Sequence, residues 1–95
     1  MRTKAKIDAN QTAIVSALRQ AGCTVQSLAA VGKGCADLLV GFRGVNYLLE
    51  IKDGTLPPSR RHLTDDQIDW HSRWRGSVRI ANSVSEALHL VGATT

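Results

Sequence analysis

The sequence has few cysteines, few prolines and few aromatic residues. Its two cysteines, Cys23 and Cys35, form no CxxC pair, and no pair of histidines lies near them in the sequence. A disulfide framework would need more cysteines, and a zinc knuckle would need metal-ligand spacing. We therefore expect two reduced, small and partly buried thiols.

Long hydrophobic runs are also missing. No apolar stretch approaches the roughly 20 residues that span a bilayer, and the segment that follows Met1 to Lys6 does not resemble a signal peptide. The expected location is the cytosol.

The composition is that of a folded chain with an excess of basic residues. Ninety-five residues, 43% of them hydrophobic and 21% charged, suit one small domain with a real core. Twelve Lys and Arg against eight Asp and Glu leave a formal net charge of +4. This balance favours a polyanionic partner without identifying it.

Glycines separate the periodic segments and predict the order αβββαβα in a single domain, residues 1–95. Residues 1–6 and 93–95 are expected to be frayed. The expected helices are 8–21, a second that starts at Thr64 and stops at Gly76, and a third opened by Ser83–Glu86; the expected strands are 23–28, 36–42, 45–52 and 77–81, with a basic loop over 54–63. The fold class is α/β, a mixed sheet flanked by helices.

The second helix opens with capping-box spacing from Thr64 to Gln67. Gln67, Trp70 and Trp74 then share one helical face with Leu63. We interpret the two tryptophans as core residues rather than base-stacking platforms, because they share the inward stripe.

The register of the predicted hairpin brings two acids together. A two-residue turn at Arg43-Gly44 pairs residues whose numbers sum to 87, which places Asp37 opposite Glu50. Lys52 lies on the same face as Glu50, because side chains alternate along a strand. Two carboxylates that face each other in apolar surroundings repel, so a positive group between them is expected.

A divalent cation would remove that repulsion. Asp37, Glu50 and the backbone carbonyl of Ile51 could supply hard oxygen ligands suited to Mg²⁺ or Mn²⁺, and Lys52 could contact a water nucleophile or a phosphate oxygen. Such a set suits metal-assisted phosphodiester hydrolysis. The alternative is that Asp37 caps a strand while Glu50 and Lys52 form an ordinary ion pair, and a one-residue change in the turn would send Asp37 to the opposite face.

These residues resemble the PD-(D/E)xK nuclease superfamily, and within it the small VRR-NUC type nucleases and Holliday junction resolvases, including those of phages and prophages. The likeness covers nearly the whole chain and agrees with the predicted element order. The residues that carry it are the segments Cys35–Gly41 and Leu49–Lys52, followed by Leu63, Thr64, Gln67 and Trp70.

The resemblance implies a restriction-endonuclease-like core and Mg²⁺-dependent cleavage of DNA, with Mn²⁺ as a substitute. It implies that Asp37 and Glu50 bind the metal and that Lys52 positions or activates water. It also implies a homodimer that acts on branched or structured DNA, such as Holliday junctions, in a bacterial or phage-infected cytosol.

Two positions depart from the family pattern. Ala36 stands where relatives often have proline, a change that should leave the direction of the aspartate intact. Relatives often carry an acidic metal ligand on the first helix, and Asp8 is the acid available there. Because Asp8 and Gln11 also have capping-box spacing, Asp8 is as readily a helix cap as a ligand. Gln11 could face the site through a water.

Gln67 also has two interpretations, as the third residue of the Thr64 capping box and as a residue near the active centre; we favour the second. Three basic residues lie in loops that adjoin the predicted site and are candidates for DNA phosphate contacts: Lys33, Arg60 and Arg61. Arg43, at the far end of the hairpin, is a weaker candidate. The glycines around Lys33 could allow close approach of the backbone to DNA or to the metal loop.

The predicted function is a structure-selective DNA endonuclease with catalytic residues Asp37, Glu50, Lys52 and Gln67. The alternative, from another class, is a DNA-binding module or nuclease subunit on the same fold that does not catalyse. A basic protein that binds an acidic protein would also fit the charge, but it would leave the two opposed acids unexplained.

Overall fold

The computed structural model describes residues 9–94, so the expectations for residues 1–6, Asp8 and Thr95 lie outside the described residues. The elements follow the predicted order, with one short addition in the basic loop. They are α1 (Ala9–Gln20), β1 (Thr24–Ser27), β2 (Leu38–Phe42), β3 (Val45–Ile51), the one-turn 3₁₀ helix η1 (Pro58–Arg60), α2 (Asp65–Arg73), β4 (Val78–Ala81) and α3 (Val84–Leu90).

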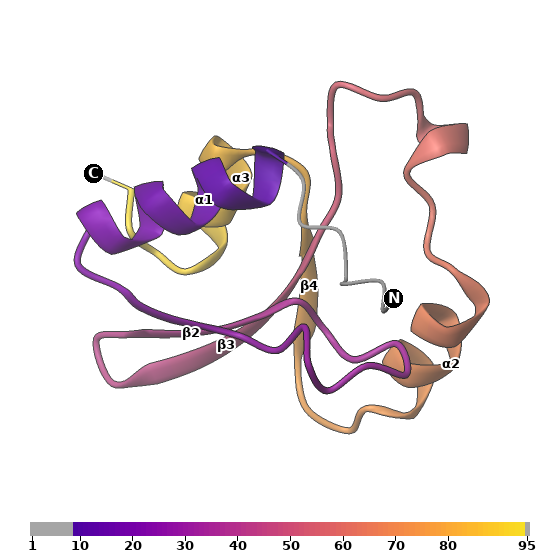
Figure 1. The fold of residues 1–95 in the computed structure, drawn as a ribbon. Coiled ribbons are helices and arrows are strands. Elements are labelled where there is room, and N and C mark those ends of the chain that lie inside the picture. The colour runs from indigo at the N-terminus through magenta and orange to yellow at the C-terminus, as the bar shows by residue number, and fades with distance from the viewer. Residues whose placement is uncertain (1–8, 95) are drawn as a thin grey trace, which may run out of the picture.

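The four strands form one mixed sheet in the order β1-β2-β3-β4 (Figure 1). β2 pairs antiparallel with both β1 and β3, whereas β4 joins β3 in parallel. Arg43 and Gly44 both have positive φ, 53° and 80°, as a two-residue type I′ hairpin turn requires. The pairing of Phe42 with Val45 fixes the predicted register along β2 and β3.

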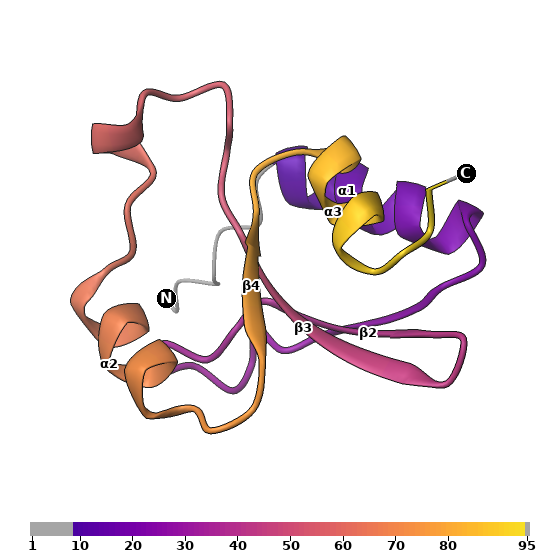
Figure 2. The ribbon, with the colours of Figure 1, turned by 180° about the vertical axis from the view of Figure 1, so that it is seen from behind.

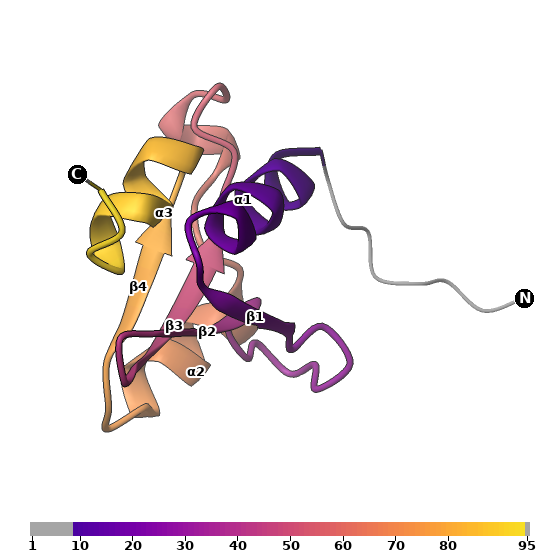
Figure 3. The same cartoon turned by 90° about the vertical axis from the view of Figure 1, so that its left-hand side faces the viewer.

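Two helices cover one face of the sheet. α1 and α3 lie side by side over it, as Figures 1 and 3 show. The core lies between these helices and the strands, and its largest buried apolar side chains are Ile14, Leu18, Leu38, Leu49, Val40 and Val91. This layer holds β2 and β3 rigidly at the centre of the sheet.

The remaining helix, α2, lies at the end of the sheet where β3 leaves the hairpin (Figure 2). The arm that joins β3 to α2 carries η1 and projects away from the sheet in Figures 1 and 2. The basic loop predicted over 54–63 therefore contains one turn of helix.

The prediction that Trp70 and Trp74 both face the core is wrong. α2 ends at Arg73, and Trp74 is its C-cap and 45% exposed. The two indoles stack on each other with centroids 4.8 Å apart. Because α2 lies at the end of the sheet instead of over a face, its stripe of large residues meets little of the core, and no residue of α2 is buried.

The end of the described chain is better ordered than predicted. Ser83 caps α3 by accepting from the N–H of Glu86, but the Glu86 carboxylate bonds Asn82, so the predicted capping box is only half formed. Ala93 donates its N–H to the Leu88 carbonyl and packs against the core, so the fraying expected at 93–95 does not include it. Within residues 9–94, no helix has the length and hydropathy needed to cross a membrane.

Candidate active site

Asp37 and Glu50 face each other as the register predicts. Asp37 directly precedes β2, and its backbone N–H donates to the Leu49 carbonyl at 3.1 Å. Its carboxylate Oδ2 accepts a 2.7 Å hydrogen bond from the N–H of Ile51. Glu50, on β3, is fully buried at 0% exposure. The sheet therefore holds one acid at a strand end and the other inside the protein.

Gln67 joins this pair to Lys52. Its side-chain Nε2 donates to Oε2 of Glu50 at 2.9 Å, and its Oε1 accepts from Nζ of Lys52 at 2.8 Å. The same residue completes the capping box with Thr64, in which both predicted hydrogen bonds form. Gln67 is thus both a member of the capping box and a neighbour of the acids. The capping hydrogen bonds fix the side-chain amide that contacts Glu50.

His71 is a site residue that the sequence prediction missed. Its Nε2 lies 3.3 Å from Oε1 of Glu50, on the other oxygen from the one that Gln67 contacts. Residues four apart on a helix share a face, so Gln67 and His71 reach Glu50 from adjacent turns of α2. That spacing was the signal: once Gln67 is placed towards the site, His71 follows.

The titration of these groups reflects their burial. Burial, followed by the hydrogen bond and charge of Asp37, raises the pKa of Glu50 to about 8, although Lys52 opposes the shift. Burial and the charge of Lys52 lower the pKa of His71, against the opposing charge of Asp37. Both shifts disfavour the charged forms, so they weaken an ion pair between Glu50 and His71.

The first helix positions the lysine. Asn10, on α1, donates from Nδ2 to the Lys52 carbonyl at 2.6 Å, and the Lys52 N–H donates to the Ala81 carbonyl at 3.0 Å. Lys52 is thus held at the point where β3 ends, with its ammonium turned to Gln67. Asn10 carries no sequence signal for this contact, since it lies 42 positions away.

A hollow of about 210 Å³ opens beside the acids. Asp37 and Gln67 line it together with Gln11, which reaches it from α1, and Cys35. Burial, with the charges of Glu50 and Asp37, raises the pKa of the Cys35 thiol. Both cysteines are free, as expected. A ligand in the hollow would meet Asp37 and Gln67 at once.

The glycine loop before β2 packs against α2. Gly34 has φ +82°, and a Cβ added there would overlap the backbone carbonyl of Asp66. The backbone therefore approaches the first turn of α2 closely at Gly34, whereas a Cβ at Gly32 would meet open space. The contact at Gly34 sets the position of the helix that carries Gln67.

Comparison with solved structures finds a domain of similar fold. A structure described as a VRR_NUC domain superposes with a TM-score of 0.62 and 27% identity, over 86% of this chain and 89% of that one. The chain has a VRR_NUC-like fold. No protein-family model and no curated protein matches it.

The three basic residues predicted to contact DNA lie in two different parts of this VRR_NUC-like fold. Lys33, with φ 55°, lies exposed between the two loop glycines that line the hollow. Arg60 belongs to η1, and Arg61 donates from Nε to the Leu56 carbonyl at 2.9 Å. Both arginines thus sit on the projecting arm, while Lys33 borders the hollow.

The residues present suit a hard divalent cation. The half-buried Asp37 and the fully buried Glu50 bring two carboxyl groups together, and burial together with Asp37 favours the form of Glu50 that holds a proton. A cation would take the place of that proton, because metal-bound carboxylates are deprotonated. Among the described residues no third His, Cys, Asp or Glu completes a ligand cluster. Further ligands would have to be water or backbone oxygen, as is usual for Mg²⁺.

Proposed function

We propose that this chain is a metal-dependent nuclease that hydrolyses DNA phosphodiester bonds. The observation that carries the proposal is the connected set Asp37, Glu50, Gln67 and Lys52, which lies beside a hollow on a VRR_NUC-like fold. Two opposed acids with a lysine beside them have a clear use in phosphodiester hydrolysis, and they are costly to bury otherwise.

Asp37 and Glu50 would hold Mg²⁺, or Mn²⁺ in its place, with the Ile51 carbonyl as a further ligand. When bound, the cation supplies Lewis-acid polarisation of the phosphoryl group and lowers the pKa of a bound water. Asp8 lies outside the described residues and stays a candidate ligand or helix cap.

The protein's own groups orient the reactants. Gln67 fixes one oxygen of Glu50 and one hydrogen of the Lys52 ammonium at the same time. Lys52 places positive charge at the edge of the site, where it stabilises charge that develops on phosphate oxygens or aligns the attacking water. Gln11 and Lys33 border the hollow and would contact the DNA backbone, with Arg60 and Arg61 reaching it from the arm.

The finer parts of the proposal rest on the resemblance noted in the sequence. They are membership of the PD-(D/E)xK superfamily, a preference for branched or structured DNA such as Holliday junctions, a homodimer, and a place in a bacterial or phage-infected cytosol. Light scattering of the purified protein tests the homodimer, since a monomer has half the predicted mass.

One experiment separates the nuclease from a DNA-binding module without catalysis. Four-way junction, flap, single-stranded and linear duplex DNA are incubated with the protein in Mg²⁺, Mn²⁺ or EDTA, beside Asp37→Ala and Lys52→Ala. The proposal predicts metal-dependent cutting, best on branched DNA, that both substitutions abolish. Tight binding without cutting under every condition would support the module instead.

A further inference from the structure

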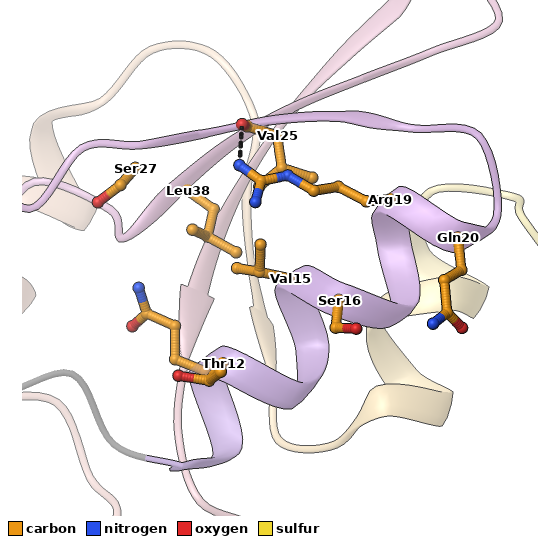
Figure 4. A pocket seen from close by; sticks show the side chains of 9 residues that line it. Thr12, Val15, Ser16, Arg19, Gln20, Val25, Ser27 and Leu38 are labelled. Carbon is orange, nitrogen blue, oxygen red and sulfur yellow. Dashed lines mark hydrogen bonds between the residues drawn. The ribbon is translucent and has the colours of Figure 1, made fainter.

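A second, larger groove lies between α1 and β1. It has a volume of about 500 Å³, and Figure 4 shows the side chains that line it. Gln11 lines both this groove and the hollow beside Asp37, so the two are adjoining. A DNA strand that extends from the hollow past Gln11 would therefore enter the groove.

The wall that α1 contributes is polar and carries positive charge. Thr12, Ser16 and Gln20 stand at intervals of four along the helix and share one face, with Arg19 beside them. No acidic side chain lines the groove, and α1 itself contains none. Hydroxyl, amide and guanidinium groups of this kind are the usual contacts to nucleic-acid phosphates and sugars.

Arg19 is already oriented across the groove. Its Nη2 donates to the Val25 carbonyl at 3.1 Å, and in Figure 4 the side chain reaches from α1 to β1. A guanidinium carries five N–H donors in a fixed fork, so this bond leaves most of its donor capacity for an anion. The backbone bond sets the direction of the positive charge.

The floor of the groove is apolar. Val15, Val25 and Leu38 lie beneath the polar wall. A groove with one charged wall and an apolar floor suits a nucleic-acid strand. The phosphates of the strand would bind the positive charge, and its sugars and bases would pack on the apolar floor. A cavity of this size accommodates a drug-sized group, which admits one strand but not a duplex.

The length also fits a strand. From Gln11 to Arg19 a helix rises about 12 Å, at 1.5 Å per residue. Because the sugar-phosphate repeat of an extended single strand is longer than the axial rise of a duplex, this distance spans only a few nucleotides.

We propose that the groove between α1 and β1 binds a single-stranded segment of the DNA substrate, with Arg19 contacting a phosphate of that segment. This rests on the proposed nuclease function and names its substrate class: DNA in which a single-stranded arm adjoins the cleavage point. Gln11 marks where the strand passes from the active site into the groove.

The test measures binding without cleavage. A fluorescently labelled single-stranded oligonucleotide is titrated with protein in EDTA, and anisotropy gives the Kd. Ser16→Glu places a carboxylate on the groove wall, one turn from Arg19, where it repels phosphate and competes for the guanidinium. Ala13→Glu puts the same charge on an exposed position of α1 that does not line the groove. If the strand binds in the groove, the Kd should rise at least about tenfold for Ser16→Glu and less than about twofold for Ala13→Glu.

Arg19→Ala supplies a readout that a structural role would not change. Loss of one phosphate contact should reduce the slope of log K against log salt by about 0.7 for a single strand. Equal effects of Ser16→Glu and Ala13→Glu, or an unchanged salt slope for Arg19→Ala, would overturn the proposal.

The two proposals fail separately. If the protein cuts DNA in Mg²⁺ but Ser16→Glu binds the oligonucleotide as the parent does, the groove is wrong and the nuclease stands. If no DNA is cut while the groove variants lose binding as predicted, the nuclease is wrong and the groove stands as the strand site of a binding module.

Discussion

The side-chain amide of Gln67 donates a 2.9 Å hydrogen bond to the buried carboxyl group of Glu50. The same amide accepts from Lys52, so one residue of α2 bridges an acid on β3 and the lysine that directly follows this strand. Gln67 is also the third residue of the capping box that Thr64 opens, so the start of the helix and the geometry of the site share one side chain.

Replacing Gln67 tests this dependence. Gln67→Ala should reduce the cleavage rate by about 10–100-fold, as is usual when a group that orients a metal ligand is removed. Thr64→Ala is the matched control, because it removes the capping acceptor but keeps the amide; it should cost about 1 kcal/mol of stability and leave the rate within a few fold. Rates are measured at saturating Mg²⁺, and stability by urea denaturation. Similar rate losses in the two variants would mean that Gln67 acts only as a cap.

The glycine loop offers a comparison of two alanine substitutions. Gly32→Ala and Gly34→Ala both put a side chain at positive φ, 71° and 82°, but only the second would collide with the backbone of α2. Because that helix must move, Gly34→Ala should destabilise the protein by about 1–3 kcal/mol more than Gly32→Ala. It should also slow cleavage by displacing Gln67. Urea midpoints and cleavage rates measure both effects, and equal midpoints would show that α2 does not rest on Gly34.

The stability of the metal-free protein should fall as the pH rises from mildly acidic to mildly alkaline. A carboxyl whose pKa is raised on folding binds its proton more tightly in the folded state, so its contribution is full below the unfolded pKa and is lost as pH rises. For Glu50 this loss runs from about 4.5 to about 8. In EDTA, the free energy of unfolding should therefore decrease between about pH 5 and about pH 8, and that of Glu50→Gln should decrease less. Parallel curves for the two proteins would contradict the raised pKa.

The exposed position of Trp74 predicts a small effect on stability. Trp74→Ala should cost less than about 2 kcal/mol, because the indole loses mainly its stacking on Trp70. Leu49→Ala, at a fully buried position on β3, should cost about 2–5 kcal/mol. Thermal or urea denaturation compares them. A larger loss for Trp74→Ala than for Leu49→Ala would place the indole in the core after all.

The central part of the site was predictable from the sequence because it depends on local rules. A two-residue turn at Arg43-Gly44 fixes the register by which Asp37 meets Glu50, and strand alternation puts Lys52 on the same face. The element order was predicted from the glycines that separate the periodic segments and from helical periodicity within those segments. Each of these signals involves residues close together in the chain.

The contributions that were missed depend on packing between distant segments. Helical periodicity identified the stripe of large residues on α2 but not the part of the protein that this stripe packs against. For that reason the tryptophans were predicted to lie in the core, and the contact between His71 and Glu50 was not predicted. Asn10 holds Lys52 across 42 positions, and no spacing rule indicates that contact. Burial of Glu50 likewise follows from how α2 closes the end of the sheet.

The most direct test of the account is the cleavage rate of Asp37→Asn on branched DNA in Mg²⁺. Asparagine keeps the size of the side chain and an oxygen that can accept from the Ile51 N–H, so the register of β2 and β3 should survive, as circular dichroism can verify. The substitution removes only the charge that would bind the cation. The account predicts metal-dependent cutting by the parent and a rate lower by more than about a hundredfold in the variant. A folded Asp37→Asn protein that cuts as fast as the parent would contradict it.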